Sequence, residues 1–67
     1  MVAEVQQLQD LVQRRVSGRV RDLRVLVRDN GVILQGRTAT YHAKQLAQHA
    51  AMEFGRQRVL ANDIEVG

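Results

Sequence analysis

Two histidines and a glutamate are the side chains of this sequence whose types and spacing best suit metal chemistry. His42, His49 and Glu53 follow one another at intervals of seven and four residues, which places them near one face of a helix. The set lacks a convincing fourth ligand, and its histidines are not the compact pair four residues apart that zinc enzymes use. We therefore expect a solvated helical surface here, with no bound metal or other cofactor.

Nucleophilic catalysis has few residues to use in this chain. There is no cysteine, the single serine is Ser17 beside Gly18, and no glycine-rich phosphate loop occurs. No pair of carboxylates is predicted to be buried together, as general acid–base catalysis would favour. We expect Ser17 to serve the end of a helix and the protein not to be an enzyme.

Arginine is the residue type whose chemistry the sequence favours. Nine of the ten basic residues are arginine, and with seven acidic residues the net charge is +3. A guanidinium group binds phosphate and carboxylate through a planar fork, so anionic partners are candidates. Interspersed charges of both signs are also typical of an ordinary soluble surface, and this alternative stays open.

The composition predicts one folded domain that spans residues 1–67. The chain is 45% hydrophobic and 25% charged and contains no proline, a globular mixture. No stretch approaches the roughly 20 apolar residues of a membrane span, and residues 1–10 do not resemble a secretory signal. If Met1 is the natural start we expect a cytoplasmic protein, and if the domain is cut from a longer chain we expect a periplasmic one.

The elements that must position these residues begin with a helix over residues 5–16. Its apolar residues recur at spacings of three and four, the pattern of an amphipathic helix, and they are Val5, Leu8, Leu11, Val12 and Val16. Gly18 can take the left-handed position that ends a helix. A second helix is predicted from Thr40, a good N-cap, to Gly55, with an apolar stripe of Ala43, Leu46, Ala47, Ala50 and Phe54.

A β-hairpin is predicted between the two helices. Leu23, Val25 and Val27 alternate with other residues, and Asn30-Gly31 is the preferred centre of a two-residue type I′ turn. With that turn, Asp29 faces Val32, Val27 faces Leu34, Val25 faces Gly36 and Leu23 faces Thr38. Because Gly36 has no side chain, we expect a helix to pack closely over the sheet at that point.

A third strand is predicted at the end of the chain. Leu60, Asn62, Ile64 and Val66 alternate with other residues and are expected on the core side. A strand, helix and strand in succession should give parallel strands. The predicted fold is α+β with element order αββαβ: a three-stranded mixed sheet with both helices packed on one face. The third strand lies either beside the second or beyond the first.

Asn62 is a polar residue on the predicted core side of the last strand. A buried amide must find hydrogen-bond partners. We expect its side chain to tie the third strand to a neighbouring loop or helix end, which is a structural role and not a ligand contact.

The combined spacing of these motifs resembles a BON domain. The match runs over nearly the whole chain and consists of a helix leading into Gly18-Arg19-Val20, Leu23-x-Val25-x-Val27, Asn30-Gly31-Val32-x-Leu34-x-Gly36, Thr40 before an alanine-rich helix, and Leu60-x-Asn62-x-Ile64-x-Val66. BON domains occur in bacterial periplasmic and envelope proteins. The resemblance implies a binding module without an active site, of a family proposed to bind phospholipids or to attach proteins to membranes.

The sheet face turned away from the helices is the predicted interaction surface. The register places on it Arg24, Leu26, Arg28, Ile33, Gln35 and Arg37, with Arg24 roughly opposite Arg37 and Val59 as an extension. Arginines mixed with aliphatic residues suit an anionic phospholipid surface or a protein partner. A solvated face with two isolated aliphatic residues is the alternative.

Three kinds of partner are compatible with the sequence to different degrees. One is an anionic phospholipid surface, bound through the outer arginines. A second is a protein partner or another copy of the chain, bound through Leu26, Ile33 and the sheet edge, because a small domain gains stability by covering them. Nucleic acid is disfavoured: the αββαβ order partly resembles a KH domain but the GxxG loop is missing, and Tyr41 and Phe54 are the only aromatic residues.

Overall fold

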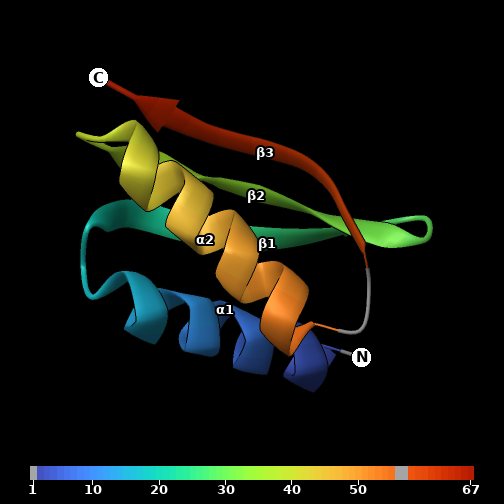
Figure 1. Ribbon diagram of the computed structural model, residues 1–67. Coiled ribbons are helices and arrows are strands. Elements are labelled where there is room, and N and C mark those ends of the chain that lie inside the picture. The colour runs from blue at the N-terminus through green and yellow to red at the C-terminus, as the bar shows by residue number, and fades with distance from the viewer. Residues whose placement is uncertain (1, 56–57) are drawn as a thin grey trace.

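The computed structural model describes residues 2–55 and 58–67, with side chains from Val5 onward. Its elements are the helix α1 (Val2–Val16), the strands β1 (Val20–Arg28) and β2 (Gly31–Thr38), the helix α2 (Tyr41–Phe54) and the strand β3 (Arg58–Val66). Both helices lie on the same face of a single sheet, with α2 running across the middle of the view in Figure 1. The predicted α+β fold with order αββαβ is confirmed.

The sheet has β2 at its centre. β1 pairs with β2 antiparallel and β3 pairs with β2 parallel, in the order β1-β2-β3. The parallel pairing was predicted from the strand-helix-strand succession, whereas the neighbour of β3 could not be predicted. β1 and β3 are therefore the two edges of the sheet.

The core lies between the two helices and the inner face of the sheet. It contains Leu8, Val12 and Val16 from α1, four alanines from α2, and Val20, Leu23, Val25, Val32, Leu34 and Ile64 from the strands. The four alanines, at positions 43, 47, 50 and 51, are fully buried and let α2 approach its neighbours closely. Two residues expected in the helical stripes, Leu11 and Phe54, are instead 37% exposed.

Phe54 is exposed because it packs between the helices at the surface. Its ring lies 4.8 Å from the guanidinium carbon of Arg15, on α1. Arg15 also donates a hydrogen bond to Glu53 over 3.2 Å. Leu11 is exposed because it lies about 100° around the helix from Val12, outside the row of residues that packs against the sheet.

The hairpin turn differs from the prediction. Arg28 pairs with Gly31, so the two loop residues are Asp29 and Asn30, and the positive φ of 34° falls on Asp29. Val25 accordingly faces Leu34 and not Gly36. The predicted register was wrong by two residues, and because side chains alternate with a period of two, every residue was still assigned to its correct face.

Gly31 serves the sheet and not the turn. A Cβ atom at this position would lie 2.5 Å from Leu60 Cγ and 2.6 Å from the carbonyl oxygen of Arg58. Both of these neighbours belong to β3. The glycine is thus required because β3 approaches β2 closely beside the turn.

Gly36 makes room for a bulge in β1. The pairing shifts between Arg21 and Arg24, where β1 carries one residue more than β2, and Asp22 has a left-handed φ of 54°. A Cβ at Gly36 would lie 2.8 Å from Val20 Cγ1 and 3.0 Å from the carbonyl oxygen of Arg21. The expectation that a helix packs over Gly36 is therefore wrong, since strand β1 occupies this space.

A second bulge, in β3, reverses the expected sides of two residues. Val32 pairs with Val59 but Ile33 pairs with Ala61, so Leu60 is the additional residue. Val59 packs against the core, whereas Leu60 is 43% exposed. The prediction had Leu60 inside and Val59 on the outer face, because it continued the alternation back through the bulge.

The helix ends agree with the sequence signals. Ser17 and Gly18, with φ of 54° and 76°, end α1, and the Ser17 hydroxyl donates to the carbonyl oxygen of Arg14 over 3.1 Å. The Thr40 hydroxyl oxygen accepts from the amide of Ala43 over 3.1 Å, as an N-cap does. Gly55 ends α2 with an extended backbone, and its amide donates to the carbonyl oxygen of Ala51.

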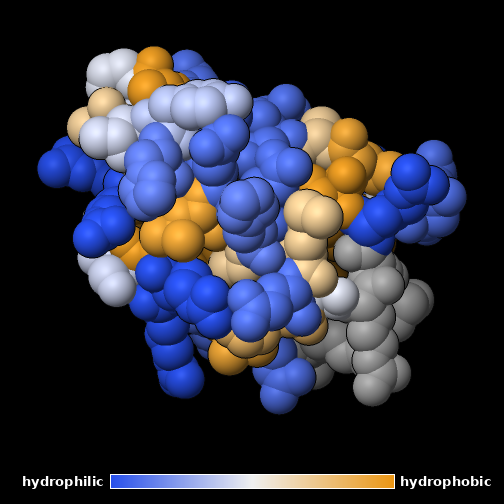
Figure 2. Space-filling model, in the orientation of Figure 1, coloured by the Kyte–Doolittle hydropathy of each residue, from blue (hydrophilic) through white to orange (hydrophobic). Residues whose placement is uncertain are grey.

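The exposed surface includes the tip of the hairpin and the outer sides of the helices. The end of the β1–β2 hairpin projects past the helices, which leaves Val27 exposed although it is on the inner face (Figure 1). Figure 2 views the helix side, where apolar atoms form separate small areas among hydrophilic side chains. Over the described part of the chain, no helix is long and apolar enough to cross a membrane.

Candidate binding surface

The sheet face opposite the helices is built from rows of paired residues. β2 pairs with both neighbours, so each β2 residue that points outward defines a row across all three strands. The rows are Arg21–Arg37–Glu65, Arg24–Gln35–Asp63, Leu26–Ile33–Ala61 and, beside the turn, Arg28–Gly31–Arg58. We call the residues of these four rows, together with Leu60, the outer face.

All five residues predicted for the binding surface lie on the outer face. Arg24, Leu26 and Arg28 come from β1, and Ile33 and Arg37 come from β2. Arg24 is opposite Gln35, however, and Arg21 is the residue opposite Arg37, because the register differs from the predicted one. The predicted extension by Val59 is wrong, since Val59 packs against the core.

Sequence reasoning missed the contribution of β3 to this face. Asp63 and Glu65 pair with Gln35 and Arg37 and therefore belong to the same two rows. Their outward direction was predictable from the alternation in the last strand. Their place beside the arginines depends on β3 pairing with β2, which no local signal indicates.

An apolar patch occupies the part of the outer face nearest the hairpin. It consists of Leu26, Ile33, Leu60 and Ala61. The Leu60 side chain lies on the outer side of Gly31, since a Cβ placed there would lie 2.5 Å from Leu60 Cγ. Leu26, Ile33 and Ala61 are half-buried, while Leu60 is exposed. The patch is larger than the two isolated aliphatic residues that the sequence alone indicated.

Charges of opposite sign are separated across the outer face. In two of the rows β1 contributes Arg21 and Arg24 and β3 contributes Glu65 and Asp63, whereas the row beside the turn has Arg28 on β1 and Arg58 on β3. In each of two rows an arginine at one edge and a carboxylate at the other are separated by β2. Among the residues that the structure describes, the ion pair within 4.0 Å is Arg15–Glu53, which lies on the helix side. The arginine and carboxylate groups of the outer face are therefore available to a binding partner.

The two sheet edges differ in how they are covered. The Gln9 side chain of α1 accepts a hydrogen bond from the amide of Val25 over 3.0 Å, which closes the β1 edge at that point. The β3 edge is interrupted by the bulge at Leu60. Bulges and covering side chains both oppose the addition of another strand. The face of the sheet is therefore better suited to binding than either edge.

Asn62 has the structural role that its position indicated. Its Nδ2 donates to the carbonyl oxygen of Lys44 over 2.9 Å and to Gln48 Oε1 over 3.3 Å, and its Oδ1 accepts from the amide of Ile64 over 3.3 Å. Both helical partners lie inside α2, not in a loop or at a helix end. Both polar atoms of the amide therefore have partners within the fold.

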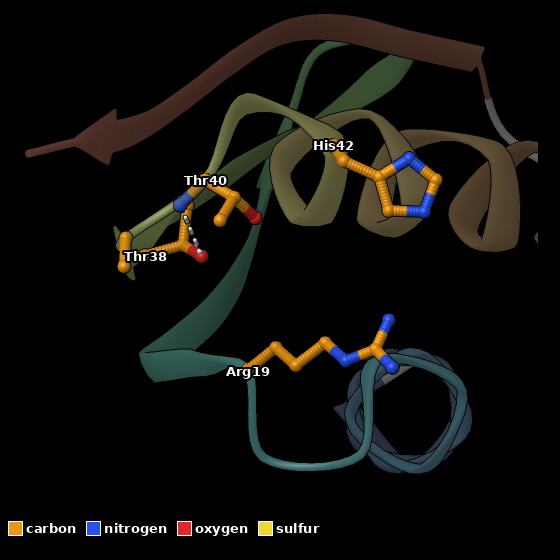
Figure 3. Close-up of a pocket in the computed structure, with 5 residues that line it drawn as sticks. Arg19, Thr38, Thr40 and His42 are labelled. Atoms are coloured by element: carbon orange, nitrogen blue, oxygen red, sulfur yellow. Dashed lines mark hydrogen bonds between the residues drawn. The ribbon is translucent and has the colours of Figure 1, made fainter.

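A shallow hollow lies where α2 begins. It has a volume of about 420 Å³ and is lined by Arg19, Thr38, Ala39, Thr40 and His42. The Thr38 hydroxyl oxygen accepts from the amide of Thr40 over 3.4 Å, and Thr40 caps the helix. Figure 3 shows Arg19 and His42 extending in the same direction from a strand start and a helix start. The two hydroxyls thus serve the local backbone.

The histidine and glutamate side chains do not form a common site. His42 and His49 are exposed, and Glu53 is bound to Arg15. No group of three potential metal ligands occurs within residues 5–55 and 58–67. The outer face therefore remains the candidate site.

Comparison with known proteins identifies no relative of this chain. No family model matches it, and no curated protein or solved structure matches it. The resemblance to BON domains therefore rests on the sequence motifs alone and is a proposal. The geometry of the outer face is therefore the basis for assigning a function.

Proposed function

We propose that this chain is a noncatalytic assembly module that binds protein through the outer face of its sheet. The observation that carries the proposal is the apolar patch of Leu26, Ile33, Leu60 and Ala61, bordered by charges of both signs. An apolar centre with a polar, charged rim is the usual composition of a protein interface. The helices cover only the inner face, so this surface is available to a partner.

The size of the domain supports the same proposal. A chain of 67 residues buries a small core, here formed between one layer of helices and one layer of strands. Covering the second face of the sheet buries further apolar surface without lengthening the chain. Small domains commonly gain stability through such association.

The assembly proposal is tested by the mass of the protein in solution. Light scattering after size-exclusion chromatography is expected to give more than one chain per particle for the wild type and one chain for Leu26→Asp. Met52→Asp is the matched control, because Met52 is 59% exposed on α2, away from the outer face. An unchanged mass for Leu26→Asp, with circular dichroism showing it folded, contradicts the proposal.

An anionic phospholipid surface is the second candidate partner. The observation that favours it is the set of four arginines that β1 and β2 contribute to the outer face, Arg21, Arg24, Arg28 and Arg37. The resemblance to BON domains supports the same partner. Against it, Asp63 and Glu65 on the same face would meet anionic headgroups, and Leu26 and Ile33 are half-buried and so poorly placed to insert.

Vesicle cosedimentation separates the two candidates. The phospholipid hypothesis expects binding to vesicles that contain phosphatidylglycerol, no binding to pure phosphatidylcholine vesicles, and loss of binding when Arg24, Arg28 and Arg37 are changed together to Glu. Equal sedimentation with both vesicle types, or binding retained by the triple variant, removes this candidate.

A further inference from the structure

We infer that the partner of the outer face is a second copy of this chain, packed face to face about a two-fold axis that runs parallel to β2. β1 of each copy then lies over β3 of the other. The inference rests on the proposed assembly function and specifies its partner and geometry. It is drawn from the arrangement of charge within the rows of the outer face.

Two of the charged rows are self-complementary at their edges under this rotation. A half-turn about an axis along β2 exchanges the two edges of the sheet while each row keeps its level. Arg24 of one copy then faces the second copy's Asp63, and Arg21 faces the second copy's Glu65. By symmetry each contact forms twice. Opposite charges therefore meet at four positions, whereas in the row beside the turn Arg28 faces the second copy's Arg58, so the opposite-charged pairs outnumber the like-charged ones.

The apolar patch is matched by the same operation. Ile33 lies on β2, close to the axis, and meets Ile33 of the second copy. Leu26 on β1 meets the second copy's Ala61 and Leu60 on β3. Two sheets packed with aligned strands lie about 10 Å apart at about 30° to each other, a distance that side chains from both faces fill. The half-buried aliphatic residues thus become the centre of the interface.

Other arrangements of two copies fit these residues less well. A two-fold axis across the strands at the level of Leu26 places β1 over β1, so that Arg24 faces the second copy's Arg28 and Asp63 faces the second copy's Arg58. Like-charged pairs are then as numerous as opposite-charged ones. Pairing through the β3 edges meets the bulge at Leu60, and pairing through the β1 edges meets Gln9, which accepts from Val25. The first arrangement forms the most pairs of opposite charge and also covers the apolar patch.

Arg37 gives the arrangement a distinctive signature. It lies on β2 near the axis, so the two copies of Arg37 approach each other, and Glu65 of the same sheet is its neighbour. Removing this central charge relieves repulsion between the copies. If the face-to-face dimer forms, Arg37→Gln is expected to lower its dissociation constant. If the outer face binds an anionic membrane, the same change is expected to weaken vesicle binding.

The decisive experiment mixes two charge-reversed variants. Sedimentation equilibrium is expected to show that Arg24→Asp and Asp63→Arg each raise the dissociation constant of the dimer by about tenfold or more, because each places like charges together twice. In an equimolar mixture the heterodimer pairs opposite charges at both positions and forms with near wild-type affinity. Native mass spectrometry identifies the heterodimer, since the two variants differ in mass.

Arg19 provides the matched control, because it lies away from the outer face. Arg19→Asp reverses a charge beside the hollow at the start of α2 and leaves the dissociation constant unchanged. If Leu26→Asp dissociates the dimer but the mixed variants show no preference for each other, the outer face mediates assembly in another arrangement. The inference then fails and the proposed function stands. A wild type that remains a single chain at every concentration tested overturns both.

Discussion

The side-chain amide of Asn62 on β3 donates to the backbone carbonyl oxygen of Lys44 inside α2, over 2.9 Å. This bond joins an edge strand to a helix across the inner face of the sheet. The same amide also contacts Gln48 and Ile64, so one polar side chain ties β3 to α2 within a largely apolar layer.

Replacing this amide tests its structural role. Asn62→Leu is expected to lower the free energy of unfolding by about 1–3 kcal/mol, since it removes the bonds that hold β3 against α2. Chemical denaturation measures the loss in the Leu26→Asp background, which the proposed function expects to be a single chain. A variant that keeps its stability but loses partner binding shows instead that Asn62 contacts the ligand.

The close approach of β3 to the hairpin is tested at Gly31. Gly31→Ala is expected to cost about 1–3 kcal/mol, because the new Cβ would lie 2.5 Å from Leu60 Cγ and 2.6 Å from a backbone oxygen. Thermal unfolding compares it with Gly67→Ala, where no atom lies within 4 Å. Equal melting temperatures for the two variants contradict the close approach.

The bulge in β3 is tested by two neighbouring substitutions. Val59→Asp places a charge against the core and is expected to cost more than about 2 kcal/mol, whereas Leu60→Asp is expected to cost less than about 1 kcal/mol. Both are measured in the Leu26→Asp background, so that assembly does not contribute. A strand that alternates without a bulge gives the reverse order.

The start of α2 is tested at its N-cap. Thr40→Ala removes the acceptor of the Ala43 amide hydrogen bond and is expected to lower the free energy of unfolding by about 1 kcal/mol. Thr40→Ser keeps the hydroxyl and serves as the control. Equal stability of the alanine and serine variants, measured by denaturant titration, shows that the cap contributes nothing.

The sequence alone was sufficient to predict the elements and, apart from the bulge in β3, the faces of the strands. The signals were local: helical spacing in residues 5–16, the N-cap at Thr40 and the alternation in β1 and β2. Each reflects the backbone geometry of a single helix or strand, so a short stretch of sequence is enough to detect it. The register of the hairpin was wrong by two residues, yet Arg24, Leu26 and Ile33 were placed on the correct face. Side chains along a strand alternate between the two faces, so a register shift of two residues leaves each side chain on the same face.

Tertiary structure alone decided the two bulges and the composition of the outer face. Nothing local distinguishes Leu60 from the alternating residues that follow it; its outward position depends on the pairing of β3 with β2 and on the space beside Gly31. Asp63 and Glu65 join the arginines only through the same pairing. Alternation along a strand depends on the strand itself, but which strand lies beside it depends on the packing of the whole chain, and the charge pattern of the outer face follows from that packing.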